Sequence, residues 1–227
     1  MGIKINLYQH QNNLLVNSFD DVTLKLLQKR RSSKIKSLLF CGSEPGVGTT
    51  TIAINLAMSL AQGKNKTLLI DADMRKTARH KRLSETPPFG LSDFLEDKTT
   101  ITEIINQTNI DYLHYITCGT PSNQSAKLLR LLSLDKLVST LSATYDFILF
   151  DSPSLDVVND GVVLSILVDG IFIVSELGRT TKSNIRKVIL NLSDSRDKIQ
   201  GILINKVNQL EYRMYIRNYD YFQRKRA

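Results

Sequence analysis

The stretch SLLFCGSEPGVGTTTI occupies residues 37–52 and joins an apolar segment, a glycine-rich turn and a segment with helical periodicity. That order predicts a buried strand, a phosphate-binding loop and a helix, which is the layout of a P-loop. The two glycines of the turn let backbone N–H groups approach a phosphate, and the helix that follows directs the positive end of its dipole toward it. The residues predicted to bind the phosphate are Gly46, Val47, Gly48, Thr49, Thr50 and Thr51.

Two positions depart from the P-loop pattern G-x-x-x-x-G-K-[ST]. Ser43 replaces the first glycine, and Thr49 replaces the lysine that places a full positive charge on the β- and γ-phosphates. Thr50 retains the hydroxyl that holds magnesium in this pattern. The sequence therefore predicts a phosphate cradle without its usual cation. A glycine-rich turn without a ligand is the alternative interpretation of this stretch taken alone.

The composition is that of a globular protein. The chain has 227 residues, of which 42% are hydrophobic and 23% charged, enough for one α/β domain. Its two cysteines, Cys41 and Cys118, lack metal-ligand spacing and fit a reducing compartment. We expect no membrane span, because no run of about 18 apolar residues occurs. The net charge of +8 suits anionic lipid, an acidic partner or plain solvation. We do not expect nucleic-acid binding, because no recognition module accompanies the charge.

Short apolar runs alternate with helical patterns along most of the chain, which predicts a doubly wound, mainly parallel sheet with helices on both faces. The acidic pair Asp20 and Asp21 is expected near the start of the first helix, where it complements the dipole. The predicted strands are residues 35–41, 66–71, 112–117, 145–151, 170–175 and 200–206. The predicted helices are residues 19–30, 52–60, 125–132, 134–142, 157–167 and 181–192. We expect a weakly ordered lead-in at 1–18, a P-loop domain at 19–207 and a Tyr/Arg-rich tail at 208–227.

Two of the predicted strands end in aspartate. Asp71 closes the strand at 66–71 and is followed by Asp73, and Asp151 closes the strand at 145–151. Ligands in open α/β sheets gather at the carboxyl ends of the strands, where the predicted P-loop also lies. Asp151 is therefore interpreted as the carboxylate that reaches magnesium directly or through water.

Residues 43–48 (SEPGVG), 69–76 (LIDADMRK) and 148–153 (ILFDSP) together are similar to the Walker A, A′ and B segments of one family. They resemble the bacterial P-loop tyrosine kinases, the cytosolic proteins that accompany capsule and exopolysaccharide synthesis. The Asp-x-Asp-x-Arg form of the second segment is typical of these kinases rather than of MinD- and ParA-type relatives. The similarity extends over roughly residues 20–210, through segments at 89–92, 119–123, 167–174, 178–181 and 201–207.

The resemblance implies roles for individual residues. ATP or ADP would bind with Mg²⁺, which Thr50 and Asp151 would hold. Asp71 and Asp73 would assist, one of them by taking the tyrosine proton, and Asn205 matches a position near the adenine. The family phosphorylates a C-terminal tyrosine cluster in trans between neighbouring subunits. The candidate acceptors in this chain are Tyr212, Tyr215, Tyr219 and Tyr221.

The resemblance also implies a place of action and a partner. Proteins of this family work at the inner face of the membrane beside a polysaccharide co-polymerase or adaptor. Self-association is implied as well, but where the family has a Glu-x-x-Arg-x-x-Arg motif this chain has Asp21, Leu24 and Leu27. Ring assembly through that contact is therefore not expected.

The missing lysine leaves three hypotheses open. The chain is a capsule-type tyrosine kinase with weakened phosphotransfer, a catalytically silent nucleotide-binding scaffold of the same machinery, or a MinD- or ParA-like positioning ATPase. The signature lysine of the third class would fall at Glu44, which argues against it. A substitute cation could come from a neighbouring subunit or from the residues after the second segment. The candidates in this chain are Arg75, Lys76 and Arg79.

Overall fold

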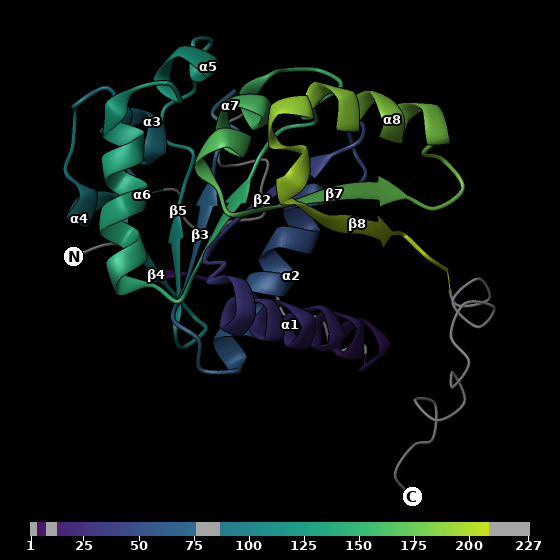
Figure 1. The fold of residues 1–227 in the computed structure, drawn as a ribbon. Helices are drawn as coiled ribbons and strands as arrows, with labels where there is room; N and C mark the ends of the chain where they lie inside the picture. The colour runs from purple at the N-terminus through teal and green to yellow at the C-terminus, as the bar shows by residue number, and fades with distance from the viewer. Residues whose placement is uncertain (1–3, 8–12, 76–86, 209–227) are drawn as a thin grey trace, which may run out of the picture.

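The computed structural model describes residues 4–7, 13–75 and 87–208, with side chains from residue 16 onward in the first helix. The described residues form one eight-stranded sheet in the order β1-β4-β5-β3-β6-β2-β7-β8. Helices cover both faces of the sheet (Figure 1). The strands are β1 (Lys4–Ile5), β2 (Ser37–Gly42), β3 (Thr67–Asp71), β4 (Asn106–Thr108), β5 (Leu113–Ile116), β6 (Phe147–Asp151), β7 (Gly170–Glu176) and β8 (Ile199–Asn205).

All neighbouring strands run parallel except β4 and β5, which pair antiparallel. The prediction of a mainly parallel, doubly wound sheet is confirmed. The helices are α1 (Asn13–Ser33), α2 (Thr49–Gln62), α3 (Leu91–Leu95), α4 (Ile101–Ile104), α5 (Ser125–Leu128), α6 (Leu132–Thr144), α7 (Asp160–Leu167), α8 (Lys182–Asn191) and the 3-10 helix η2 (Ser193–Lys198).

The sheet separates two hydrophobic cores. The core under α1 and α2 includes Leu26, Leu56 and Phe147, while the core on the opposite face includes Leu137, Leu164 and Val188 from α6, α7 and α8. Every residue of β2, β3 and β6 is buried, as expected of central parallel strands that are covered on both faces. These three adjacent strands carry the P-loop and the two aspartates to one edge of the sheet.

The first helix differs from its prediction. It begins at Asn13 rather than at residue 19, so Asp20 and Asp21 lie in its interior and its first turn has no acidic residue. Its basic end, at Arg30 and Arg31, is confirmed. Inside the helix the Asp20 carboxylate accepts a hydrogen bond from the Ser59 hydroxyl of α2, at 2.8 Å. The acidic side chain therefore fastens α1 to α2 instead of capping α1. Part of the expected lead-in is also regular structure, since Lys4–Ile5 form β1.

Other boundaries shifted as well. The helix predicted at 125–132 is only one turn, α5, and α6 starts at Leu132. The helix predicted at 157–167 begins at Asp160, after a short turn that follows Pro153. Five short elements were not predicted, namely β1, β4, α3, α4 and η2. Each has six residues or fewer, too few for apolar periodicity to distinguish it from a loop.

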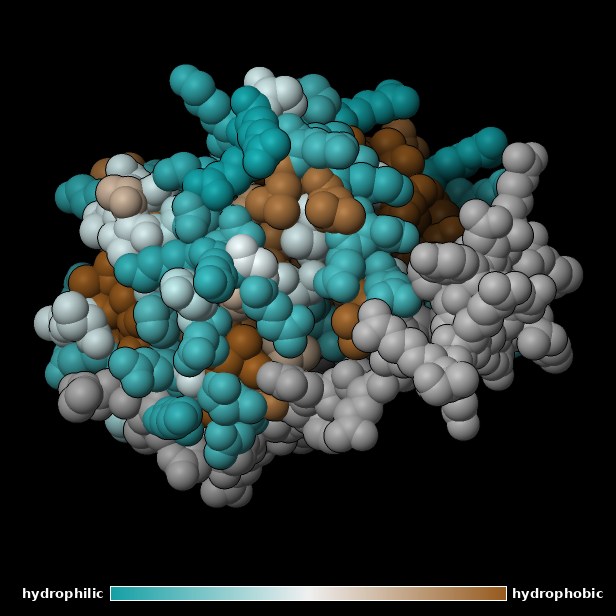
Figure 2. Space-filling view, turned by 90° about the horizontal axis from the view of Figure 1, so that it is seen from below, coloured by the Kyte–Doolittle hydropathy of each residue, from teal (hydrophilic) through white to brown (hydrophobic). Residues whose placement is uncertain are grey.

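The face of the molecule that carries α1 is mostly polar. Figure 2, which views the molecule from the side of α1 and α2, shows hydrophilic side chains over most of this face with apolar atoms in separate places. Exposed apolar side chains of α1 include Val16 and Leu24. Within the described ranges, no helix combines the length and the apolar character that crossing a bilayer requires.

Candidate functional site

The turn between β2 and α2 has the backbone of a phosphate-binding loop. Gly46 has φ 82° and Gly48 has φ 91°, in the left-handed region that strongly favours glycine. Gly48 is the N-cap of α2, and its carbonyl accepts the first helical hydrogen bond, from the Ile52 amide at 3.0 Å. The helix therefore starts directly at the loop, so its first N–H groups and its dipole are available to an anion.

Thr49 occupies the position of the missing lysine with its side chain against the base of the loop. A Cβ on Gly42 would lie 2.8 Å from the Thr49 hydroxyl oxygen, so the glycine at the end of β2 makes room for this side chain. Thr50, the next residue, is half-buried. The short Thr49 side chain fills space beneath the loop but brings no charge to it.

Asn205, at the end of β8, closes the loop from another strand. Its side-chain amide donates to the Val47 carbonyl at 2.8 Å. The same amide packs so closely on Gly48 that a Cβ there would collide with it. The structure thus places Asn205 at the loop, where it holds the loop backbone, and its suggested position near an adenine stays a prediction.

The three predicted aspartates meet beside the loop. Asp71 and Asp151 are direct register partners on β3 and β6, and Asp151 also pairs with Phe40 of β2. All three carboxylates are buried, with 1% exposure for Asp71, 5% for Asp73 and 3% for Asp151. The Asp73 amide donates to an Asp71 carboxylate oxygen at 3.0 Å, so the Asp71 side chain also holds the backbone directly after β3.

Tyr115 of β5 adjoins these carboxylates and was not anticipated. It is buried, and its pKa lies well above the ordinary value because of burial first and the nearby Asp71 and Asp151 charges next. A hydrogen bond between its side chain and Asp71 adds to the effect. Tyr115 is therefore a neutral hydroxyl donor that orients Asp71. Its position in the predicted strand at 112–117 was the only sequence signal for it.

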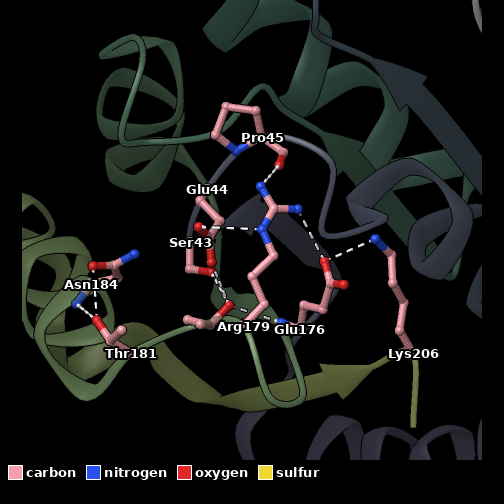
Figure 3. Close-up of polar contacts among 9 residues, drawn as sticks. Ser43, Glu44, Pro45, Glu176, Arg179, Thr181, Asn184 and Lys206 are labelled. Carbon is pink, nitrogen blue, oxygen red and sulfur yellow. Dashed lines mark hydrogen bonds and ion pairs between the residues drawn. The ribbon is translucent and has the colours of Figure 1, made fainter. Parts of the chain in front are cut away.

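The turn after β7 packs on the first half of the loop (Figure 3). The Thr180 hydroxyl donates to the Glu44 carboxylate at 2.7 Å and lies 3.2 Å from the Ser43 hydroxyl. The Ser43 amide donates to the Val174 carbonyl of β7 at 2.8 Å. Ser43, which replaces the first glycine of the pattern, is thereby built into this contact.

Arg179 is the basic side chain of this turn, and it lies over the loop (Figure 3). Its guanidinium donates to the Pro45 carbonyl at 3.3 Å and to the Glu176 carboxylate at 3.2 Å, and its Nε lies 3.8 Å from a Glu44 carboxylate oxygen. Sequence reasoning missed it as a cation. The available signal was its place in residues 178–181, directly after a strand whose carboxyl end faces the site.

The substitute cations considered from the sequence are placed differently. Arg75 forms a two-pronged ion pair with Asp160, with Nε and a terminal nitrogen 3.3 and 3.2 Å from the two carboxylate oxygens. Asp160 is fully buried at the start of α7 and also accepts from the Ser125 hydroxyl at 2.6 Å. Through Asp160, Arg75 therefore links the segment after β3 to α5 and α7. Lys76 and Arg79 lie outside the described residues, as do the four tail tyrosines.

The residues at this edge fit a magnesium nucleotide. The two left-handed glycines shape the loop for a phosphate, as in other P-loops. Mg²⁺ needs few protein ligands because it retains several waters, so the Thr50 hydroxyl and the Asp151 carboxylate supply a suitable set. Cys41 does not serve as a metal ligand here, because burial raises its pKa to about 12 and its thiol stays protonated.

Comparisons with known proteins agree with this geometry. A family model described as an AAA domain matches residues 36–204. The tyrosine-protein kinase CpsD of Streptococcus agalactiae is 32% identical over 176 residues, covering 77% of this chain and 76% of that protein. The crystal structure of the chimerical protein CapA2B2 matches with a TM-score of 0.79 at 25% identity. The match covers 91% of this chain and 95% of the CapA2B2 chain.

A more distant structure shares the fold alone. The septum site-determining protein MinD from Pyrococcus horikoshii, complexed with Mg-ADP, has a TM-score of 0.63 at 18% identity and covers 77% of this chain and 72% of its own. The glycine-rich loop, the aspartates at the strand ends and the 32% identity to CpsD point to one group within this fold. The chain belongs to the family of bacterial P-loop tyrosine kinases.

Proposed function

We propose that this chain binds ATP and ADP with Mg²⁺ at the loop of residues 46–51 and acts as a tyrosine autokinase with weakened phosphotransfer. The observation that carries the proposal is the convergence of the loop, Asp71 and Asp151 on three adjacent parallel strands. Thr50 and Asp151 would hold the metal, which supplies charge neutralisation to the phosphates when bound. The loop N–H groups would bind phosphate oxygens, and Asn205 holds the Val47 carbonyl by a hydrogen bond.

The buried carboxylates supply the acid–base part of the proposal. Asp71 or Asp73 takes the proton of an incoming tyrosine hydroxyl, and Tyr115 orients Asp71 by its hydrogen bond. The acceptors are the tail tyrosines Tyr212, Tyr215, Tyr219 and Tyr221, supplied by a second copy of the chain. By analogy with the family, the protein acts at the cytoplasmic face of a membrane beside a polysaccharide co-polymerase.

A catalytically silent nucleotide-binding scaffold is the second candidate function, and Thr49 favours it. Loss of one charge-assisted contact to a transferring phosphoryl group costs on the order of a hundredfold in rate. A MinD-like role has less support, because Glu44 stands where that class has its signature lysine. The Glu44 carboxylate is engaged by Thr180 and Arg179 of its own chain.

Mass spectrometry of the tail separates the two candidates. Purified protein is incubated with MgATP beside an Asp151→Asn variant, and phosphotyrosine is scored at the four tail positions. Phosphotyrosine in the wild type alone supports the autokinase. Mixing a tagged Asp151→Asn chain with wild type tests transfer in trans, because only a neighbouring active chain could label the tagged tail. Nucleotide binding without phosphotyrosine supports the scaffold, and the absence of both contradicts the proposal.

A further inference from the structure

Arg179 is placed over the phosphate loop by its own turn. Gly178 has φ 76°, and the Thr180 amide donates to the Glu176 carbonyl at 3.0 Å, so residues 176–180 form a compact turn after β7. The Thr180 hydroxyl accepts from the Glu176 amide at 3.0 Å and fastens the turn to Glu44. The backbone that carries Arg179 is therefore docked on the loop.

The guanidinium reaches the part of the loop that cradles phosphate. A terminal nitrogen of Arg179 lies 3.7 Å from where a Cβ on Gly46 would stand, and the other donates to the Pro45 carbonyl. Gly46 opens the run of backbone N–H groups expected to bind the phosphate. The hydrogen bonds to Pro45 and Glu176 use two of the five guanidinium N–H donors.

The charges around Arg179 leave its guanidinium only weakly held by its present partners. Lys206 lies 2.8 Å from the same Glu176 oxygen that accepts from Arg179. The pKa of Glu176 is lowered, chiefly by the Lys206 contact and further by Arg179. Lys206 thus shares the charge of Glu176, and this weakens the hold of Glu176 on Arg179. The Arg179 side chain is 49% exposed, so its guanidinium has room to turn from the Glu44 carboxylate toward a phosphate at Gly46.

We propose that Arg179 is the phosphate-binding cation of this site and takes over part of the role of the lysine that Thr49 replaces. The inference rests on the proposed nucleotide binding at residues 46–51. The terminal phosphates of a nucleoside triphosphate draw the guanidinium away from Glu44, and Arg179 donates to their oxygens while it keeps its contact with Pro45. A cation supplied from within the chain in this way resembles an arginine finger acting in cis.

The first test compares affinities for MgAMP-PNP and MgADP, measured by calorimetry on the full chain. Arg179→Ala should weaken MgAMP-PNP binding about tenfold or more, since it removes charge-assisted hydrogen bonds to phosphate. Arg179→Lys should restore part of the loss, and adding Thr49→Lys to Arg179→Ala should restore more. Arg186→Ala is the matched control, because it removes the same charge from an exposed position of α8 seven residues away. Its affinity should equal that of the wild type.

A second test separates phosphate binding from a merely structural contact. Glu44→Gln keeps an acceptor for Thr180 but releases Arg179, so it should tighten MgAMP-PNP binding roughly threefold, as expected for the loss of one long ion pair whose guanidinium is half exposed. If Arg179 only braced the loop through Glu44, the same change would weaken binding. Glu44→Gln could also tighten binding by removing the repulsion between Glu44 and phosphate, and the double variant Glu44→Gln/Arg179→Ala separates the two causes. If Arg179 mediates the gain in affinity, Glu44→Gln should give no gain when Arg179 is already alanine. If repulsion causes the gain, it should remain.

The outcomes also separate this inference from the proposed function. If the wild type binds MgAMP-PNP and Arg179→Ala binds it with the same affinity, the proposed role of Arg179 is overturned. The proposed nucleotide binding then still stands. A Glu44→Gln gain that persists without Arg179 would overturn the role of Arg179 as well. Absence of MgADP and MgAMP-PNP binding in the wild type at millimolar concentration would overturn the proposed function itself, and the role of Arg179 with it.

Discussion

At the scale of single residues, Thr49 bears most directly on the proposed phosphotransfer. A lysine at this position would place its charge on the β- and γ-phosphates, whereas the threonine hydroxyl lies against Gly42 at the base of the loop. Arg179 approaches the loop from the outer side and is shared with two carboxylates, so it replaces only part of that charge. We expect the change to weaken nucleotide binding less than phosphotransfer, because the loop N–H groups remain.

Thr49→Lys should raise ATP turnover or tail phosphorylation at least about tenfold, which is the effect of one cation that clamps a transferring phosphate. Turnover is followed by phosphate release, and labelling of the tail by mass spectrometry. Thr49→Met is the matched control, since it adds length without charge. A site that stays silent with the lysine in place would mark the chain as a scaffold.

Replacing Asp151 should stabilise the ligand-free protein and weaken its response to MgADP. The Asp151 carboxylate and that of Asp71 are buried on directly paired strands, where two like charges repel each other. Asp151→Asn should therefore raise the unfolding midpoint of the ligand-free protein by at least about 2 °C. The same variant should lose most of the further rise that MgADP gives the wild type. A lower midpoint without ligand would show that the charge of Asp151 is compensated within the fold.

At the scale of elements, the ion pair between Arg75 and Asp160 joins the end of β3 to the start of α7. Asp160 is fully buried, so removal of its partner leaves a charge in the interior. Arg75→Ala should lower the free energy of unfolding by about 3 kcal/mol. The exposed pair of Lys187 and Asp156 provides the control, and Lys187→Ala should cost less than about 1 kcal/mol.

Urea unfolding of both variants measures this difference. Adding Asp160→Asn to Arg75→Ala should recover part of the lost stability, because the buried group is then neutral and still hydrogen-bonds to Ser125. Equal losses in Arg75→Ala and Lys187→Ala would contradict a structural role for the buried pair and return Arg75 to the candidates for phosphate binding.

The sequence predicted the elements that are marked by a local pattern of apolar and turn residues. The buried strands β2, β3 and β6 are continuous apolar runs with turn residues on either side, so their positions and the place of Asp71 and Asp151 were predictable. The start of α1 was not, because the polar residues before Phe19 carry no apolar periodicity. The contacts of Asn205 and Arg179 with the loop join residues more than 130 positions apart, and sequence spacing alone cannot reveal them.

At the scale of the whole molecule, five neighbouring strands bring the parts of the site to one edge of the sheet. The P-loop follows β2, Asp71 and Asp151 end β3 and β6, the turn after β7 carries Arg179, and Asn205 ends β8. Helices on both faces keep this sheet buried, so the site has a rigid base. The account depends on one property of this assembly, namely that the loop binds a magnesium nucleotide although its lysine is absent.

Calorimetric titration with MgADP tests that property most directly. The wild type should bind with micromolar to submillimolar affinity, and Thr50→Val should remove the part of the affinity that depends on Mg²⁺ while it keeps the shape of the side chain. Titration with ADP in the presence of EDTA measures the metal-independent remainder, which should be equal in the two proteins. A wild type that takes up no MgADP at millimolar concentration would contradict the account.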